Sequence, residues 1–237
     1  MEDRGEFCKI ATNDMSKSKL RAVIFDLDDT LFHTTEAWRE ARLAFLRELG
    51  IEPLGSGTLE SAGHSARTTA RILALRFAVT KRQGPWERIF VTALHEAVRT
   101  TPPALMPGAR QILLELQGRC LLGLASGSPA VVIQTLLTQA GMSATFDCVL
   151  SSESFPQCKP APDVFLGVAD HLKVAPSACL VIEDSLVGVQ AARAAGMTCF
   201  AIPSQTAQLH AMESMGARPF GDLREAAAVL VRELASA

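Results

Sequence analysis

Short apolar runs alternate with longer stretches of helical periodicity over most of the chain. Runs of four to eight β-branched, aromatic or aliphatic residues predict buried strands, and apolar positions spaced three and four apart predict amphipathic helices. The predicted strands are 21–26, 119–125, 146–150, 179–183 and 197–202. The predicted helices between and after them are 109–117, 129–139, 162–172, 186–195 and 222–235. Repeated strand–helix units of this length predict an α/β fold with a parallel sheet covered on both faces.

The first strand–helix unit is interrupted by a long helical insertion. A helix is predicted over 33–49, further helical sequence continues to about Thr101, and Pro102-Pro103 ends the region. We therefore expect three parts, with the N-terminal part a mobile leader without an apolar run. The expected boundaries are a leader at 1–19, an α/β core at 20–32 and 104–237, and a helical cap domain at 33–103.

Composition excludes several classes of protein. The chain has 237 residues, 48% hydrophobic and 20% charged, with a net charge of −2, which is typical of a globular domain and not of a basic nucleic-acid binder. The longest apolar runs are shorter than the roughly 18 residues that a membrane-spanning helix needs. Six scattered cysteines without a CxxC pair indicate a reducing compartment. We expect a cytoplasmic monomer that binds neither nucleic acid nor membrane.

Polar residues follow the predicted strands where each strand ends. The first strand leads into residues 26–30 (DLDDT), the second into 126–128 (SGS), the third is followed by Lys159, and the fourth leads into 183–185 (EDS). A single strand-end acid can simply cap the next helix, but several carboxylates at one edge of a sheet repel one another unless a cation is present. Hard oxygen ligands favour Mg²⁺. The residues predict a metal-dependent site for an anionic substrate.

Four segments resemble the ordered motifs of the haloacid dehalogenase superfamily. They are FDLDDT at 25–30, ASGS at 125–128, Lys159 within CKPAPDVF, and VIEDSLVGVQAARAAGM at 181–197. The segment between the first two motifs is similar to the helical cap of the phosphatase and β-phosphoglucomutase branch. The resemblance implies a doubly wound Rossmann-like parallel sheet with an inserted cap that closes over the active site.

The resemblance also implies a role for each motif residue. Asp26 would be the nucleophile that forms an aspartyl-phosphate, and Asp28 the acid and base that protonates the leaving alcohol and later activates water. Ser126, Gly127 and Lys159 would bind the phosphate. The Mg²⁺ ligands would be Asp26, Asp28, Asp184 and Glu183. The implied activity is hydrolysis of a small phosphorylated metabolite.

Departures from the pattern bear on the alternatives. Dehalogenating members lack a second acid at the position of Asp28, which argues against dehalogenation. A sugar phosphomutase is the main alternative, but this chain has Asp29 where the mutase has glycine and Trp38 where it has a histidine. The cap arginine, Arg67, also lies one position later than the phosphate-binding arginine of the mutase. A non-catalytic binding protein would not need the acid at 28.

Overall fold

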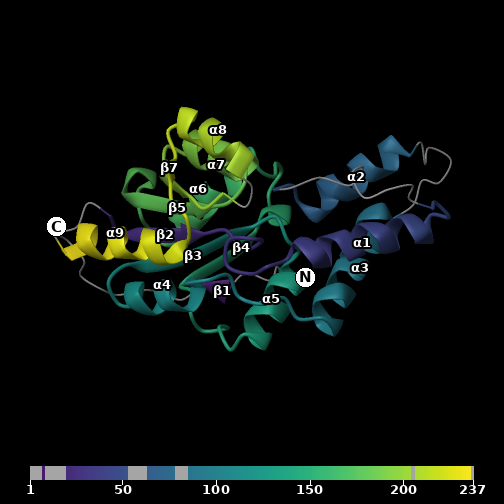
Figure 1. Cartoon of the computed structure of the whole chain (residues 1–237), viewed down its shortest axis with the longest axis horizontal. Helices are drawn as coiled ribbons and strands as arrows, with labels where there is room; N and C mark the ends of the chain where they lie inside the picture. Colours follow the sequence, from purple (N-terminus) through teal and green to yellow (C-terminus); the bar gives the residue numbers. More distant parts are fainter. Residues whose placement is uncertain (1–6, 9–19, 53–62, 78–84, 204–205, 236–237) are drawn as a thin grey trace.

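A computed structural model describes residues 7–8, 20–52, 63–77, 85–203 and 206–235 (Figure 1). Its centre is a seven-stranded sheet with the strand order β1-β4-β3-β2-β5-β6-β7. The strands are β1 (Phe7–Cys8), β2 (Ala22–Phe25), β3 (Leu121–Ser126), β4 (Cys148–Ser151), β5 (Cys179–Glu183), β6 (Thr198–Ala201) and β7 (Arg218–Pro219).

Six of these strands, β2 to β7, run parallel, and β1 pairs antiparallel with the edge of β4. β2 lies at the centre, with Phe25 opposite Leu124 of β3 and Ile182 of β5. The strand order reverses direction on the two sides of β2, which is the place where open parallel sheets bind ligands beyond the carboxyl ends of their strands. The register therefore brings the residues that follow β2, β3 and β5 to one edge.

Helices cover both faces of the sheet, as the predicted doubly wound fold requires (Figure 1). One face packs on α4 (Ala109–Leu116), α5 (Ala130–Gln139) and α9 (Leu223–Ala235), and the other on α6 (Asp163–His171), α7 (Leu186–Ala194) and α8 (Leu209–Ser214). Side chains of one strand alternate between the two faces. Val23 and Phe25 accordingly join one buried cluster, while Ala22 and Ile24 join the other.

Three helices lie together beyond one end of the sheet, on the right in Figure 1. These are α1 (Thr35–Glu48), α2 (Ala66–Arg76) and α3 (Trp86–Thr100), here named the α1–α3 group. Phe90 of α3 lies at its centre, with ring centroids 5.7 Å from both Trp38 and Phe45 of α1. The group falls within the expected cap, 33–103. Where that cap begins and ends as a domain stays a prediction.

The two connections between the α1–α3 group and the rest of the chain run side by side. The backbone N–H of His33 donates to the carbonyl of Ala104 at 2.8 Å, and that of Met106 donates to the carbonyl of Leu31 at 2.9 Å. Backbone pairing of both connections ties the start and the end of the insertion to each other.

The sequence prediction differs from the structure mainly at the edges of the sheet. β1, β7 and α8 were not predicted, and each has two to six residues, too short for a periodicity to develop. Of the expected leader, Phe7–Cys8 form β1, whereas residues 1–6 and 9–19 lie outside the described residues.

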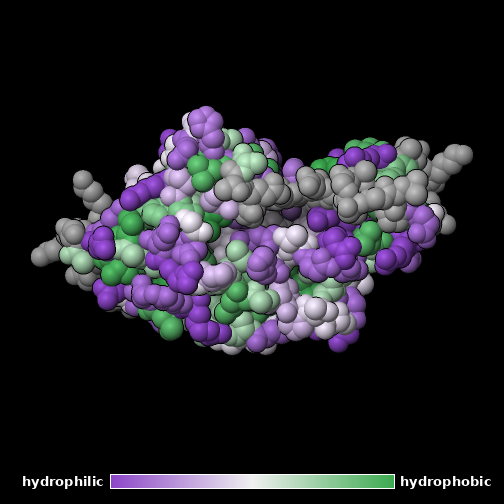
Figure 2. Space-filling view, in the orientation of Figure 1, coloured by the Kyte–Doolittle hydropathy of each residue, from purple (hydrophilic) through white to green (hydrophobic). Residues whose placement is uncertain are grey.

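On the surface, hydrophilic and hydrophobic residues are interspersed over the face seen in Figure 2. Among the described residues, the exposed large apolar side chains sit on four different helices: Ile72, Leu75, Leu114, Val131 and Leu166. Within the described part of the chain, no helix combines the length and the apolar character needed to cross a bilayer.

Candidate active site

Asp26 and Lys159 form a buried ion pair at the end of the central strand. Asp26 directly follows β2, and its Oδ1 accepts a hydrogen bond from Lys159 Nζ at 2.6 Å. Their side chains are 8% and 2% exposed. Burial raises the pKa of Asp26 well above its ordinary value; Lys159 opposes this rise, and the neighbouring Glu183 and Asp28 carboxylates add to it. The site therefore lacks positive charge for the carboxylates that it holds.

Lys159 is fixed by four groups that surround its ammonium. Besides Asp26, Nζ donates to Glu183 Oε1 at 2.7 Å and to the carbonyl of Ala125 at 3.1 Å, and it lies 4.7 Å from the ring centroid of Phe165. Burial lowers the pKa of Lys159, but the two carboxylates outweigh it and raise that pKa above its ordinary range. The lysine is thus held charged and aimed at Asp26.

Both carboxylate oxygens of Glu183 accept hydrogen bonds from neighbouring residues. Its Oε2 accepts 2.9 Å hydrogen bonds from the backbone N–H of Asp184, the backbone N–H of Ser185 and the Ser185 hydroxyl. Ser185 in turn begins α7, because its Oγ accepts the N–H of Gly188 at 3.1 Å. With Oε1 on Lys159, the geometry fits Glu183 as the residue that positions Lys159 better than as a metal ligand.

Asp28 lies apart from this ion pair and has a different set of donors. Its Oδ2 accepts the hydroxyls of Ser126 and Ser128, both at 2.9 Å, and its Oδ1 accepts the indole N–H of Trp38 at 2.8 Å. Burial nevertheless raises the pKa of Asp28 above its ordinary value, against the lowering effect of these hydrogen bonds. Two carboxylates two residues apart therefore occupy distinct environments, which is how acid and nucleophile roles are separated.

The loop after β3 lies beneath the first turn of α2. The Gly127 carbonyl accepts the N–H of Ala66 at 3.4 Å, and a Cβ added at Gly127 would lie 3.3 Å from the His64 carbonyl oxygen. Ser126 Oγ also accepts the N–H of Ser128 at 2.9 Å, which fixes the loop. Ser126, which bonds to Asp28, and Gly127, which bonds to the start of α2, are both predicted to bind phosphate.

Three buried carboxylates come close enough to share one cation. Oxygen atoms of Asp26, Glu183 and Asp184 lie within 4.8 Å of one another, and Asp184 Oδ1 also accepts the Thr30 hydroxyl at 3.3 Å. An all-oxygen donor set fits a hard divalent cation such as Mg²⁺. Since Glu183 is already bonded on both oxygens, Asp26 and Asp184 are the donors that suit an ion best.

Asp29 stands where the sugar phosphomutase, the alternative considered above, has glycine. Its role here is to hold the backbone at the start of α1. It adopts a left-handed backbone with φ 55°, a conformation that Asp tolerates better than most residues. Its Oδ1 accepts the N–H of Thr34 and Thr35 at 3.0 and 3.1 Å, where α1 begins. The carboxylate thereby anchors the chain as it enters the α1–α3 group.

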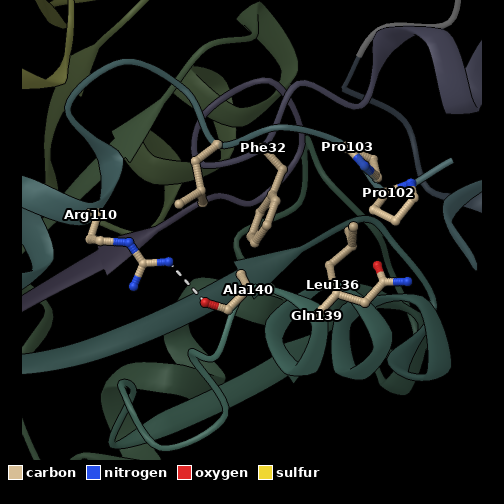
Figure 3. A pocket seen from close by; sticks show the side chains of 8 residues that line it. Phe32, Pro102, Pro103, Arg110, Leu136, Gln139 and Ala140 are labelled. Carbon is tan, nitrogen blue, oxygen red and sulfur yellow. Dashed lines mark hydrogen bonds between the residues drawn. The ribbon is translucent and has the colours of Figure 1, made fainter.

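Apart from this site, a small cavity lies beside the paired connections (Figure 3). Its volume is about 130 Å³, and one wall is formed by Phe32 and Pro102-Pro103. The other wall belongs to α5. At the end of this helix, the Arg110 guanidinium donates a hydrogen bond to the carbonyl of Ala140 at 2.9 Å. None of the residues that line it is a carboxylate, so the cavity has no part in the acidic cluster.

Comparison with known proteins decides the family. A family model described as a haloacid dehalogenase-like hydrolase matches residues 20–196. The chain belongs to this family. It is accordingly an enzyme of the hydrolase class, and the resemblance drawn from the four motifs is confirmed.

Curated members of the family extend the comparison. Hexitol phosphatase B of Escherichia coli is 32% identical over 197 residues, which cover 80% of this chain and 86% of that protein. Fructose-1-phosphate phosphatase YqaB of E. coli is 41% identical over 80 residues, 34% of this chain and 43% of that protein. The chloroplastic protein SUPPRESSOR OF QUENCHING 1 of Arabidopsis thaliana is 34% identical over 81% of this chain, but the match spans only 18% of its length.

Solved structures share the fold. A protein described as a candidate β-phosphoglucomutase from Bacteroides vulgatus superposes with a TM-score of 0.76 at 22% identity, covering 93% of this chain and 91% of that one. CbbY from Rhodobacter sphaeroides gives a TM-score of 0.70 at 22% identity, over 86% and 95% of the two chains. The doubly wound α/β fold predicted from the sequence is that of this haloacid dehalogenase-like family.

Sequence reasoning missed the partners that hold the motif residues of this hydrolase. Ser128 was predicted only as part of the second motif. The signal for its hydrogen bond to Asp28 was its place two residues after Ser126. Nothing in the local sequence indicated that Trp38 or Phe165 would contact Asp28 or Lys159, because those contacts depend on how helices pack.

Proposed function

We propose that this hydrolase is a Mg²⁺-dependent phosphatase that hydrolyses a small phosphomonoester through an aspartyl-phosphate on Asp26. The observation that carries the proposal is the separation of the two carboxylates. Asp26 faces the Lys159 ammonium, whereas Asp28, two residues later, is held by two hydroxyls and an indole N–H. One carboxylate is thus arranged to attack and the other to exchange a proton.

In the first half-reaction, an Asp26 oxygen forms a bond to phosphorus while the bond to the alcohol oxygen breaks. Asp28, which enters protonated, gives its proton to the departing alkoxide. Lys159 stays ion-paired beside the reacting oxygens, and the Ser126 hydroxyl and the Gly127 N–H hold the phosphoryl oxygens. The product of this step is the free alcohol.

In the second half-reaction, water attacks the phosphorus of the aspartyl-phosphate. Asp28 takes a proton from that water, the bond between Asp26 and phosphorus breaks, and inorganic phosphate leaves. Asp26 is then an unmodified carboxylate and Asp28 is again protonated. The two residues therefore return to their starting states, and atoms and protons balance over one turnover.

The cation would be held mainly by Asp26 and Asp184, with Asp28 and Glu183 as the remaining predicted ligands. When bound, Mg²⁺ supplies the positive charge that lets a carboxylate approach a phosphate dianion. The buried carboxylates within 4.8 Å of one another support this part of the proposal.

For the substrate, we propose a phosphorylated sugar or sugar alcohol. The support is the similarity to hexitol phosphatase B over most of both chains, joined by the shorter similarity to a fructose-1-phosphate phosphatase. Because the α1–α3 group closes over the loop at Ser126–Ser128, the non-phosphate part of the substrate would lie against that group.

The test is a phosphate-release screen over phosphorylated metabolites, with hexitol and ketose phosphates included, with Mg²⁺ and with EDTA. We expect Mg²⁺-dependent release from a few sugar or polyol phosphates and from none after chelation. Asp26→Asn should lower kcat by at least about 10³-fold with an unchanged circular dichroism spectrum, because it removes the nucleophile. Turnover of that variant at the wild-type rate would contradict the mechanism.

A sugar phosphomutase remains the alternative reading of the same site. It would need a bisphosphate to regenerate its phosphoenzyme and would release little phosphate from the monophosphates in the screen. A non-catalytic binding protein would release none with or without Mg²⁺. The same screen, repeated with a sugar bisphosphate, therefore separates the three possibilities.

A further inference from the structure

Arg67 and Glu153 form a reciprocal pair between α2 and the loop after β4. The backbone N–H of Arg67 donates to Glu153 Oε1 at 2.9 Å, and the Arg67 guanidinium donates through Nη2 to the Glu153 carbonyl at 2.7 Å. The two residues are 86 positions apart in the sequence. Each residue therefore uses both its backbone and its side chain on the other, which is far more specific than a surface ion pair.

This pair holds the turn of chain that lies over the predicted phosphate loop. Arg67 is in the first turn of α2, which Ser65 begins by accepting the N–H of Thr68. The preceding residues approach the active-site loops closely: a Cβ added at Gly63 would lie 2.6 Å from Ser185 Oγ, and one at Gly127 would lie 3.3 Å from the Cα of Ser65. Any shift of this turn changes the space above Ser126–Ser128.

The surroundings of the guanidinium leave it little freedom to bind a substrate. Glu87 Oε1 of α3 lies 3.9 Å from Arg67 Nε, and Cys158 Sγ lies 4.0 Å from Nη2. The guanidinium therefore faces the Glu153 carbonyl and Glu87.

We propose that Arg67 and Glu153 are positioning residues that fix the start of α2 over the Ser126–Ser128 loop and thereby set the affinity for the non-phosphate part of the substrate. The proposal rests on the proposed phosphatase function and extends it to specificity. The pair does not touch the reacting atoms, so it affects binding of a substrate that fills the space under α2 more than the chemical steps.

The kinetic test compares two substrates in Arg67→Met, Glu153→Ala and the double variant. For the best metabolite of the screen, we expect each single variant to raise KM about tenfold or more with kcat changed less than threefold. With p-nitrophenyl phosphate, whose flat ring needs few contacts to the α1–α3 group, kcat/KM should stay within threefold. Arg67→Met removes the guanidinium bond to the Glu153 carbonyl, and Glu153→Ala removes the acceptor of the Arg67 N–H. Because both bonds hold the same turn, the effects of the two changes should not add in the double variant.

Two further variants serve as controls. Glu153→Gln retains an oxygen that accepts the Arg67 N–H, so its KM should stay within threefold of the wild type. Arg76→Met changes an exposed arginine of the same helix, and its KM should not change. Equal losses on both substrates, or a loss of kcat rather than a rise in KM, would overturn the proposal.

A readout independent of activity separates failure of this proposal from failure of the proposed function. Hydrogen–deuterium exchange should be faster at the amides of residues 66–69 in Arg67→Met than in the wild type and Arg76→Met, with β2 and β5 unchanged. Unchanged protection there would overturn the positioning role even if the enzyme hydrolyses phosphates. Faster exchange in a protein that releases no phosphate would contradict only the proposed function.

Discussion

Asp28, the residue that exchanges protons in the proposed mechanism, is held in one orientation by the side chains around it. Three donors, from Trp38, Ser126 and Ser128, lie between 2.8 and 2.9 Å from its oxygens, so its orientation is fixed before any substrate binds. The Ser126 hydroxyl is also the group expected to bind phosphate. Substrate binding must therefore redirect that hydroxyl, which would leave Ser128 and Trp38 to hold Asp28 in place.

Replacing Trp38 by phenylalanine tests this orientation. Trp38→Phe keeps an aromatic ring against Phe90 but removes the N–H on Asp28. We expect kcat for an alkyl phosphate to fall about threefold to tenfold, and kcat for p-nitrophenyl phosphate to fall less, because a good leaving group needs little protonation. Steady-state kinetics on both substrates measure the difference.

The other tryptophan provides the control. The indole N–H of Trp86 is buried without a hydrogen-bond partner among the described residues, so Trp86→Phe should leave the ratio of the two rates unchanged. A fall of the same size on both substrates in Trp38→Phe would show that the indole serves packing and not Asp28.

For single residues, the sequence predicted which polar side chains meet at the end of the sheet, but not which side chains hold them there. Asp26, Asp28 and Lys159 follow strands and belong to recognisable motifs, so their type and position carried the prediction. Trp38 and Phe165 are apolar residues on helices, and their sequence pattern indicates only burial. Which buried ring meets which polar group depends on tertiary packing, which a single sequence does not encode locally.

Among the elements, the start of α7 shows how a helix can orient a side chain of the preceding strand. Gly188 lies so close to Glu183 that an added Cβ would be 1.6 Å from Oε1. The absence of a side chain at this position lets the N-terminal turn of α7 lie against the carboxylate that also accepts hydrogen bonds from Lys159 and Ser185. The helix, the strand and Lys159 thus form one connected unit.

Gly188→Ala should break that unit. The new methyl group must displace Glu183, which costs Lys159 one of its two carboxylates in a buried site. We expect a loss of unfolding free energy of about 2–4 kcal/mol, together with a large loss of kcat. Urea denaturation measures the first and phosphate release the second.

Gln190→Ala on the exposed side of the same helix is the matched control and should leave both quantities near wild type. If Gly188→Ala unfolds at the same urea concentration as the wild type, the close approach of α7 to Glu183 does not contribute to stability.

Element boundaries followed from the sequence pattern for the inner strands as well as for the helices: the strand predicted at 179–183 is β5, Cys179–Glu183. The nine-residue helices α6 and α7 were predicted to within one residue at each end, whereas the two-residue strands β1 and β7 were missed. Such short edge strands are defined by their backbone partners on β4 and β6 and not by their own composition.

For the whole molecule, the contact between the α1–α3 group and the loop after β4 has a consequence for stability. The Glu153 carboxylate accepts the N–H of Arg67 of α2, and Arg67 also lies 3.9 Å from the carboxylate of Glu87 of α3. Burial raises the pKa of Glu153 from 4.5 to about 7; the Arg67 N–H opposes this rise and the Glu87 carboxylate adds to it. The folded protein therefore holds a proton on Glu153 that the unfolded chain has already lost near neutral pH.

The sign of the pH dependence follows from this difference. Because the pKa is raised in the folded state, the contribution of Glu153 to stability is fully present below about pH 4.5 and is lost as the pH rises through about 7. Since Glu153 is only partly buried, we expect the loss to be about 1–3 kcal/mol and not the full value for such a shift. Glu153→Gln carries no titratable group and should lack this loss.

Urea unfolding of the wild type and Glu153→Gln at intervals from pH 5 to pH 8 measures this contribution of Glu153 to stability. Subtracting the two curves of unfolding free energy against pH removes the contribution of every other titrating group. The free energy of unfolding of the wild type should fall relative to that of the variant as the pH rises. Glu87→Gln should move the midpoint of the fall to lower pH, since it removes the carboxylate that raises the pKa of Glu153. A difference that stays constant with pH, or that grows in favour of the wild type, would mean that Glu153 is ionised in the folded protein and that closure of the α1–α3 group does not bury it.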